Sequence, residues 1–197
     1  MGTKDFNALD LFICRWRSRA VRKLVPSGAT VLDFGCGHQA MFLRSVQHDI
    51  KYGLGIDYDA TPERPAPNLE LRQFRFENRF DFPDASFDLV TILAVLEHIP
   101  LDRVDVLFRE FSRILVPGGR ILVTTPTPAA KPVLEFLAFR LKIISAAEIA
   151  DHRHYYTEQD LMKLAARNGL TCPAYRRFLW GFNGVAVMQK PGLGAAV

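Results

Sequence analysis

Cysteine is scarce in this sequence, which has three (Cys14, Cys36 and Cys172) among 197 residues. The number is odd, and no two of them form a C-x-x-C pair. Disulfide-stapled domains and structural zinc sites need more cysteines at closer spacing. The composition therefore excludes a disulfide framework and a cysteine zinc site, and it is typical of a protein kept in a reducing compartment.

Long hydrophobic runs are also missing. No stretch reaches the ~20 apolar residues that a membrane-spanning helix needs. The N-terminal residues lack the apolar core of a secretory signal. On this basis we expect a cytoplasmic protein.

The sequence also lacks a strong charge of one sign. Its formal net charge is +4, and Lys and Arg are scattered apart from a basic stretch at residues 15–23. Nucleic-acid-binding surfaces carry a denser basic stripe, so we expect no nucleic-acid partner. Nothing in the sequence sets the oligomeric state, which stays open.

What the sequence does contain is a set of short strand-like runs alternating with helical or loop stretches. Hydrophobic residues make up 49% of the chain, enough for one domain spanning residues 1–197. Two of the runs are almost continuously apolar, as in strands buried on both faces of a parallel sheet. The pattern predicts an open α/β sheet. The expected strands are 30–34, 51–57, 69–74, 87–93 and 119–125.

Other segments complete this outline. Three prolines in residues 61–68 predict a loop where a crossover helix is usual. Near the end, Thr157 and Gly169 bracket a helix, and a glycine-rich turn then predicts a closing antiparallel hairpin. The tail at 191–197 is expected to be flexible.

Residues 1–28 contain a predicted basic amphipathic helix. We favour packing over a sheet edge with its arginines in water. The alternative is peripheral contact with a membrane surface, which is not favoured because a basic face alone is a weak signal.

The first strand ends at a glycine turn that is typical of a cofactor site. Asp33 precedes Gly35-Cys36-Gly37, and Asp57 follows Gly37 by 20 residues, at the end of the next strand. Ligands collect at the carboxyl ends of such strands, and an acid after the second strand can accept both hydroxyls of a ribose. A dinucleotide needs G-x-G-x-x-G, but Ala40 takes the third position, and Asp33 would repel a pyrophosphate. The acid suits a cationic ligand better.

Four motifs in this order resemble the class I S-adenosylmethionine-dependent methyltransferases, of the compact small-molecule type often called type 11. They are "VLDFGCG" (31–37), "GIDYD" (55–59), "FPDASFDLVTILAVLEHI" (82–99) and "ILVPGGRILVTTP" (114–126). The resemblance implies a Rossmann-like, doubly wound α/β fold with helices on both faces. Its seven-stranded, mostly parallel sheet has the order 3-2-1-4-5-7-6, with strand 7 antiparallel. The implied cofactor is S-adenosyl-L-methionine, leaving as S-adenosyl-L-homocysteine.

The resemblance also implies roles in binding the methionyl and ribose groups. Asp33 lies near the amine, and the backbone of Gly35, Cys36 and Gly37 approaches the methionyl portion. Asp57 takes the ribose hydroxyls. Two further residues border the same ligand: Tyr58 beside the adenine, and Gln39 at the edge of the methionyl pocket. We expect Gln39 to begin the following helix, at little conformational cost.

On the adenine side the chain departs from the family. Phe76 stands where an acid usually binds the adenine amino group, and Glu77 follows it. Either the Glu77 side chain or its backbone is expected to replace that acid. Leu93, Ala94 and Val95 are expected to line the cofactor with backbone groups.

Two histidines are the candidate catalytic residues. His98 follows the fourth strand near the expected methyl position. The alternative is that it only shapes the site, because it resembles a histidine of family members with very different substrates. His152 and His154 lie in "DHRHYYTEQD", where His154 or Tyr155 is expected to face the pocket. The H-x-H pair has no third ligand nearby in the sequence, so no metal is expected.

Residues 131–155 follow the fifth strand, where the family inserts its acceptor-binding lid. The segment is rich in Leu, Ile and Phe. We interpret it as a cover for a small-molecule acceptor that is apolar or lipid-linked, the alternative being a helix packed on its own core or on a dimer partner. The leading function is methyl transfer. The competing ones are a methyltransferase-fold binding module without activity and, less favoured, an NAD(P)-binding oxidoreductase.

Overall fold

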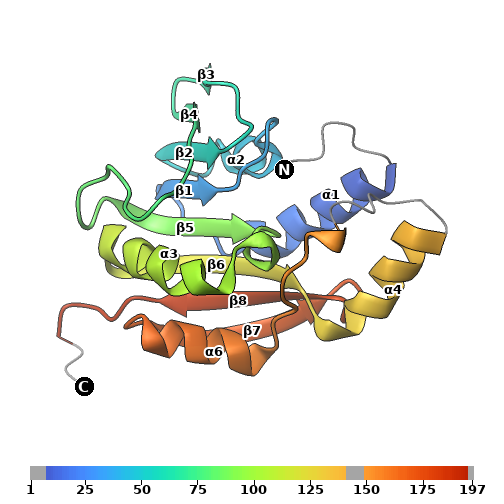
Figure 1. Cartoon of the computed structure of the whole chain (residues 1–197). Helices are drawn as coiled ribbons and strands as arrows, with labels where there is room; N and C mark the ends of the chain where they lie inside the picture. The colour runs from blue at the N-terminus through green and yellow to red at the C-terminus, as the bar shows by residue number, and fades with distance from the viewer. Residues whose placement is uncertain (1–7, 141–148, 195–197) are drawn as a thin grey trace.

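One continuous β-sheet forms the middle of the molecule (Figure 1). In the computed structural model, which describes residues 8–140 and 149–194, eight strands pair in the order β3-β4-β2-β1-β5-β6-β8-β7. The five central strands, from β4 to β6, are parallel, and β8 lies antiparallel between β6 and β7. The strands are β1 Thr30–Phe34, β2 Tyr52–Asp57, β3 Glu63–Ala66, β4 Leu69–Gln73, β5 Phe87–Leu93, β6 Leu115–Pro126, β7 Thr171–Phe178 and β8 Asn183–Gln189.

The sheet confirms the predicted order for the seven expected strands and adds an eighth. The segment 61–68, expected to be a loop, contains β3, which pairs antiparallel with β4 at the sheet edge. Pro65 is tolerated there because an edge strand does not need every N–H for the ladder. The fifth predicted strand also begins earlier, at Leu115 instead of Gly119.

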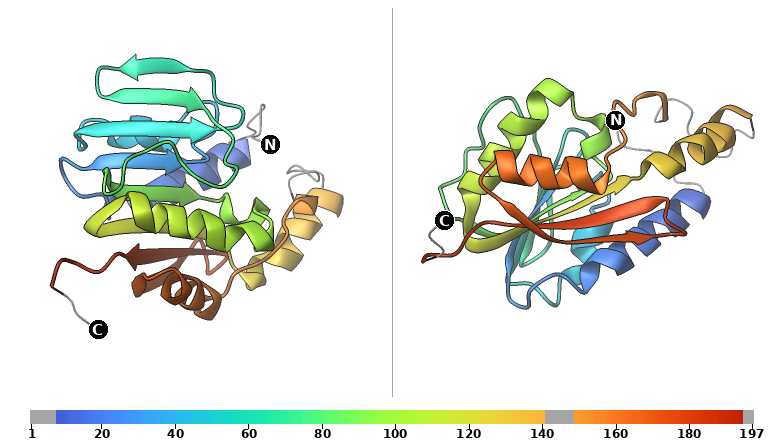
Figure 2. Two further views of the ribbon diagram at one scale, coloured as in Figure 1. Left: turned by 60° about the vertical axis from the view of Figure 1, so that its left-hand side comes forward. Right: turned by 90° about the horizontal axis from the view of Figure 1, so that it is seen from below.

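Helices cover both faces of the sheet (Figure 2). α1 and α2 lie on one face, and α3 and α6 lie on the other. The helical segments are α1 Ala8–Arg22, α2 Met41–Val46, η1 Leu96–His98, α3 Leu101–Ile114, η2 Pro128–Ala130, α4 Lys131–Glu135, the π-helical η3 Phe136–Arg140, and α6 Glu158–Arg167.

The central strand β5 shows why two helical layers are needed. Its side chains alternate between the two cores: Val90 and Ile92 join the core under α3 and α6, while Leu89 joins the core under α1 and α2. All three are fully buried. A strand that is apolar on both sides must be covered on both sides, so the continuous apolar run at 87–93 correctly indicated a central position.

The C-terminal elements match their sequence signals. Thr157 caps α6 through a capping box with Asp160, whose amide lies 3.2 Å from the Thr157 hydroxyl. Gly169 follows the helix with φ +70°, and β7 and β8 form the expected antiparallel hairpin.

The N-terminal helix α1 lies across a face of the sheet, not over its edge as expected. Val21 is fully buried against the core on that side. The arginines are not all in water: Arg17 is half-buried, and its Nε is fully buried. Among the described residues, none of the helices combines the length and the hydrophobicity needed to cross a bilayer.

Candidate functional site

The candidate site is a cavity of about 830 Å³ at the carboxyl ends of β1, β2 and β5. In Figure 1 these strand arrows point toward α1 and α4. Pockets for drug-sized ligands run from about 300 to 1,000 Å³, so this cavity is at the large end of that range. Most of the predicted site residues line it: Asp33, Gly35, Cys36, Gly37, Gln39, Asp57, Tyr58, Phe76, Leu93, Ala94, Val95 and His98.

The glycine turn after β1 is held open by two left-handed residues. Gly35 has φ +73° and Gly37 has φ +67°, and a Cβ on Gly35 would collide with the Val95 side chain. The Gly37 amide donates to Asp57 Oδ2 over 2.9 Å, which ties the turn to the end of β2. Burial raises the pKa of the Cys36 thiol between them, so this thiol is neutral. The amides of Gly35 and Cys36 donate to Ile56 O, so the turn is a backbone cradle that offers a ligand close approach and not free N–H groups.

The residue with an unfavourable backbone in this loop is Ala40, not Gln39. Ala40 has φ 44° and ψ 43°, and α2 begins one residue later, at Met41. Gln39 is exposed in the preceding turn and lines the cavity. The expectation that Gln39 begins the helix was therefore wrong. The third position of the glycine motif does need a left-handed residue, at ~1–2 kcal/mol for a residue with a Cβ.

Asp33 is a buried carboxylate facing this cradle. Its side chain is 2% exposed, and Oδ1 accepts a hydrogen bond of 2.6 Å from the Thr91 hydroxyl. Thr91 stands opposite Asp33 in the register of β1 and β5. Burial raises the pKa of Asp33 to about 7; Thr91 opposes this rise and the charge of Asp57 adds to it. A carboxylate held in this way is stabilised by a cation.

Asp57 and Tyr58 stand at the opposite side of the turn. Asp57 accepts the Gly37 amide on Oδ2 and the Asp59 amide on Oδ1, at 2.9 Å each. Each carboxylate oxygen keeps a second lone pair for a ligand hydroxyl. Tyr58 is 57% exposed, and the Arg75 guanidinium lies 5.6 Å from its ring centre, within cation–π range.

The side expected to hold the adenine is apolar. Phe76 packs on Phe80 with ring centres 4.7 Å apart, and it lines the cavity. Glu77 is exposed and is not among the cavity-lining residues, so the structure does not bring it to the site. Ala94 lines the cavity, but its amide already donates to Thr124 O over 2.9 Å. A ligand could not use that N–H.

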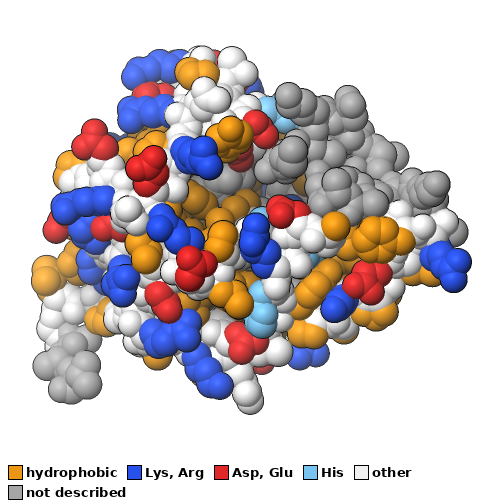
Figure 3. Space-filling view, viewed as in Figure 1, with side chains coloured by type: hydrophobic (Ala, Val, Ile, Leu, Met, Phe, Trp, Pro, Cys, Tyr) orange, Lys and Arg blue, Asp and Glu red, His pale blue; other side chains and the backbone are white. Residues whose placement is uncertain are grey.

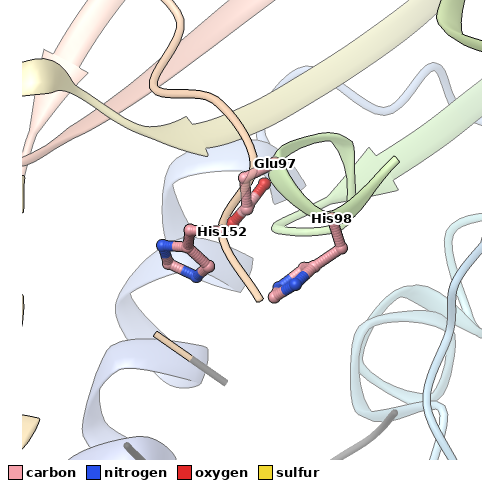
Figure 4. A group of neighbouring side chains, drawn as sticks. All are labelled: Glu97, His98 and His152. Atoms are coloured by element: carbon pink, nitrogen blue, oxygen red, sulfur yellow. The ribbon is translucent and has the colours of Figure 1, made fainter. Parts of the chain in front are cut away.

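A cluster of titratable side chains lies deeper in the cavity. His98 Nδ1 is 3.2 Å from Asp151 Oδ2, and the His98 and His152 ring centres are 4.8 Å apart. The Arg153 amide donates to Glu97 O over 2.8 Å, which fixes the segment after residue 150 against η1. Figure 4 shows Glu97, His98 and His152 converging from these two segments.

Two members of this cluster are strongly affected by burial. Burial lowers the pKa of His152 to about 4, so this imidazole is neutral at pH 7. Burial also raises the pKa of Glu97, whose side chain is 2% exposed. The cluster therefore offers two imidazoles and two carboxyl groups to whatever occupies this part of the cavity.

His154, the other predicted catalytic residue, is not brought to this cluster. Its Nε2 lies 3.8 Å from Asp160 Oδ2, its side chain is 40% exposed, and it does not line the cavity. His152 lines the cavity in its place, and Tyr155 does not line it either. Residues 152 and 154 would point to the same side in a regular strand, so the segment is not a regular strand here. The D-H-R-H pattern indicated the segment but not which histidine faces inward.

The predicted lid contributes apolar residues to the lining of the cavity. Val133, Leu134 and Leu137 line it, and Phe136 and Phe139 are exposed. In Figure 3, hydrophobic side chains gather on the right, where Figure 1 places α4. Residues 141–148, also part of the predicted lid, lie outside the described residues.

Comparison with known proteins agrees with this geometry. The sequence profile of a methyltransferase domain matches residues 7–174. The chain is 26% identical over 154 residues to a ubiquinone biosynthesis O-methyltransferase of Aeromonas salmonicida, covering 73% of this chain and 63% of the relative. It is 29% identical over 138 residues to a demethylmenaquinone methyltransferase of Bacillus licheniformis, covering 64% of this chain and 59% of the relative. The match therefore spans less than two thirds of either relative.

The fold is similar to that of solved structures. An S-adenosylmethionine-dependent methyltransferase of Mesorhizobium loti superposes with a TM-score of 0.66 at 17% identity, over 87% of this chain and 96% of that one. At this identity the likeness concerns the fold alone. It is the mixed α/β Rossmann-like fold described above.

Proposed function

The chain belongs to the class I S-adenosylmethionine-dependent methyltransferase family, and from this premise we propose that it methylates a small-molecule acceptor. The observation that carries the proposal is the cradle formed by the glycine turn and the two acids beside it. It combines a buried carboxylate, Asp33, with a second one, Asp57, that is bonded to the turn. A pyrophosphate would be repelled there, whereas an ammonium would be attracted.

The described residues fit the cofactor. The left-handed Gly35 and Gly37 leave the backbone bare, so that a ligand can approach it closely. Asp33 would hold the amine, Asp57 the ribose hydroxyls, and Phe76 with Tyr58 would flank the adenine. When bound, S-adenosylmethionine supplies the methyl group, which passes to the acceptor as the sulfonium becomes the thioether of S-adenosylhomocysteine.

His98 is the catalytic residue of this proposal. Asp151 engages Nδ1, which leaves Nε2 to take the proton of an acceptor hydroxyl. A positioned base contributes typically ~10²–10⁴-fold. Alignment of the acceptor in the cavity contributes more, up to ~7–11 kcal/mol of the barrier.

The acceptor class follows from the apolar part of the cavity lining. It includes Ile13 on α1, Leu134 on α4 and Leu137 on η3. The two relatives are named for ubiquinone and demethylmenaquinone. The apolar lining supports an apolar acceptor, and the O-methyltransferase relative supports transfer to a hydroxyl group.

Calorimetric titration with S-adenosylhomocysteine tests the cofactor assignment. Asp57→Asn is expected to weaken binding by ~10–100-fold, because charged hydrogen bonds contribute ~1.5–3 kcal/mol. Asp81→Asn is the matched control, since Asp81 is exposed and outside the cavity lining. Absence of binding to the unaltered protein would favour a binding module without activity, and tight NAD(H) binding instead would favour an oxidoreductase.

Transfer of a tritiated methyl group to cell extract tests the acceptor class. We expect label in the lipid-soluble, small-molecule fraction, and less of it with the Asp57→Asn protein. Label found solely in protein or RNA contradicts the small-molecule assignment.

A further inference from the structure

We propose that Glu97, His98 and His152 form a binding site for one divalent first-row transition-metal ion, such as Zn²⁺ or Mn²⁺. Each residue offers one ligand atom, and these atoms all lie within 4.8 Å of one another. Glu97 and His98 come from η1, and His152 comes from the segment before α6 (Figure 4). All three line the cavity.

Glu97 provides an independent reason to expect a ligand here. Its side chain is 2% exposed. The Thr125 hydroxyl is near enough to lower the pKa of Glu97, but Oε2 makes no hydrogen bond of proper geometry among the described residues. An unpaired buried carboxylate oxygen is costly. A cation at the cluster would satisfy this oxygen.

The two histidines are already oriented as metal ligands usually are. His98 Nδ1 is 3.2 Å from Asp151 Oδ2, and His152 Nδ1 is 3.1 Å from the Tyr155 hydroxyl. Ligand histidines generally use the second ring nitrogen for such a partner, often a carboxylate, which fixes the ring. Nε2 of each ring is then the nitrogen that faces a metal ion.

The ligand set indicates which ions the site takes. Two imidazoles and one carboxylate suit Zn²⁺, Mn²⁺ or Co²⁺ better than Mg²⁺ or Ca²⁺, which prefer oxygen ligands alone. Three protein ligands also leave a coordination position open, as in catalytic zinc sites. That position faces the cavity.

One nearby charge opposes the cation. Arg17, on α1, lines the same cavity and acts electrostatically on Glu97, although no ion pair joins these two described side chains. Asp151, bonded to His98, adds a negative charge to the cluster. With Glu97 it gives the cluster two carboxyl groups against the one arginine, which favours a cation.

The ion would change how the acceptor is activated, and this part rests on the proposed function. In the metal-free protein, His98 Nε2 takes the acceptor proton. With an ion bound, Nε2 would be a ligand, and the ion would make an acceptor hydroxyl at the open position more acidic, so that its proton passes to water.

Titration of the EDTA-treated full chain with Co²⁺ at pH 7.5 tests the site, followed by visible absorption and calorimetry. We expect one ion per chain. Glu97→Gln and His152→Gln should weaken binding at least 100-fold, and Asp151→Asn by ~10–100-fold. His154→Gln is the matched control, since it removes the other histidine of the H-x-H pair and should change affinity less than twofold.

Absence of stoichiometric Co²⁺ binding, or an equal loss of affinity in His152→Gln and His154→Gln, overturns the proposal.

Substoichiometric Mn²⁺ gives a test by NMR that needs no variants. The ring-proton signals of His98 and His152 should broaden before those of His38, His48 and His154. Uniform broadening of all five also overturns it. Titration with S-adenosylhomocysteine in the same samples separates the two proposals, because a chain that binds the nucleoside but does not bind Co²⁺ retains the proposed function and loses the metal site.

Discussion

The buried carboxylate of Asp33 makes a pH dependence that can be worked out from the structure. Its pKa is raised from the ordinary 3.8 to about 7, chiefly by burial. Below pH 4 the group is protonated in both the folded and the unfolded chain. Between pH 4 and 7 only the unfolded chain loses the proton, so the free energy of unfolding falls by about 1.4 kcal/mol per pH unit.

Asp33→Asn removes this dependence. The change from 3.8 to about 7 corresponds to about 4 kcal/mol in total. The amide oxygen of asparagine can still accept the 2.6 Å hydrogen bond from Thr91, so the fold is retained. The variant should therefore gain stability relative to the unaltered protein as the pH rises, by about 4 kcal/mol between pH 4 and pH 8.

Urea unfolding of both proteins at unit pH steps measures the effect. The other titrating groups are common to the two chains, so their contributions cancel in the difference between the two free energies of unfolding. Two parallel stability curves would refute the reasoning, since Asp33 would then be ionised at its ordinary pH.

The same substitution should act in the opposite direction on ligand binding. An ammonium near Asp33 favours the ionised carboxylate. The affinity of the unaltered protein for S-adenosylhomocysteine should therefore fall up to tenfold per unit as the pH decreases from 7 to 5.5. The Asp33→Asn protein should bind more weakly, with little dependence on pH in this range.

Two further substitutions test the loop after β1, and a third tests the Arg113–Glu110 pair on α3. Gly35→Ala should lower the free energy of unfolding by at least ~1–2 kcal/mol through its positive φ, and it should weaken nucleoside binding. Adding Val95→Ala should recover the part of this loss that comes from collision with the Val95 side chain. A double variant with no recovery would contradict that collision. Ala40→Gly should raise the free energy of unfolding by ~1 kcal/mol in urea titrations, because the φ of 44° at this position is a glycine conformation. A lower free energy of unfolding would show that alanine is not strained in this loop. Arg113→Lys should lower the free energy of unfolding by ~2 kcal/mol, because Arg113 binds both oxygens of Glu110 and lysine lacks the planar guanidinium. An unchanged urea midpoint would show that a single bond to Glu110 gives the same stability.

The sheet and the cofactor cradle were largely readable from the sequence, because their signals are local. A strand buried on both faces must be mostly apolar, as 87–93 is apart from Asp88 and Thr91, and a strand-to-helix turn that exposes its backbone needs Gly35 and Gly37. Edge strand β3 was missed because proline argues against a strand except at an edge. The sequence does not indicate which strand lies at the edge of the sheet.

The rest depended on contacts between distant residues. Asp33 was identified as an acid beside the turn, but its raised pKa comes from burial, opposed by the hydrogen bond from Thr91, 58 residues away. His98 and His152 are 54 positions apart, and neither predicts the other. The backbone bond from Arg153 to Glu97 brings them together. The sequence by itself determined the fold class and the glycine turn, because periodicity and glycine conformation are properties of neighbouring residues. Only the tertiary structure decided which histidine enters the cavity and which carboxylates are buried, because burial and orientation depend on what packs against each side chain.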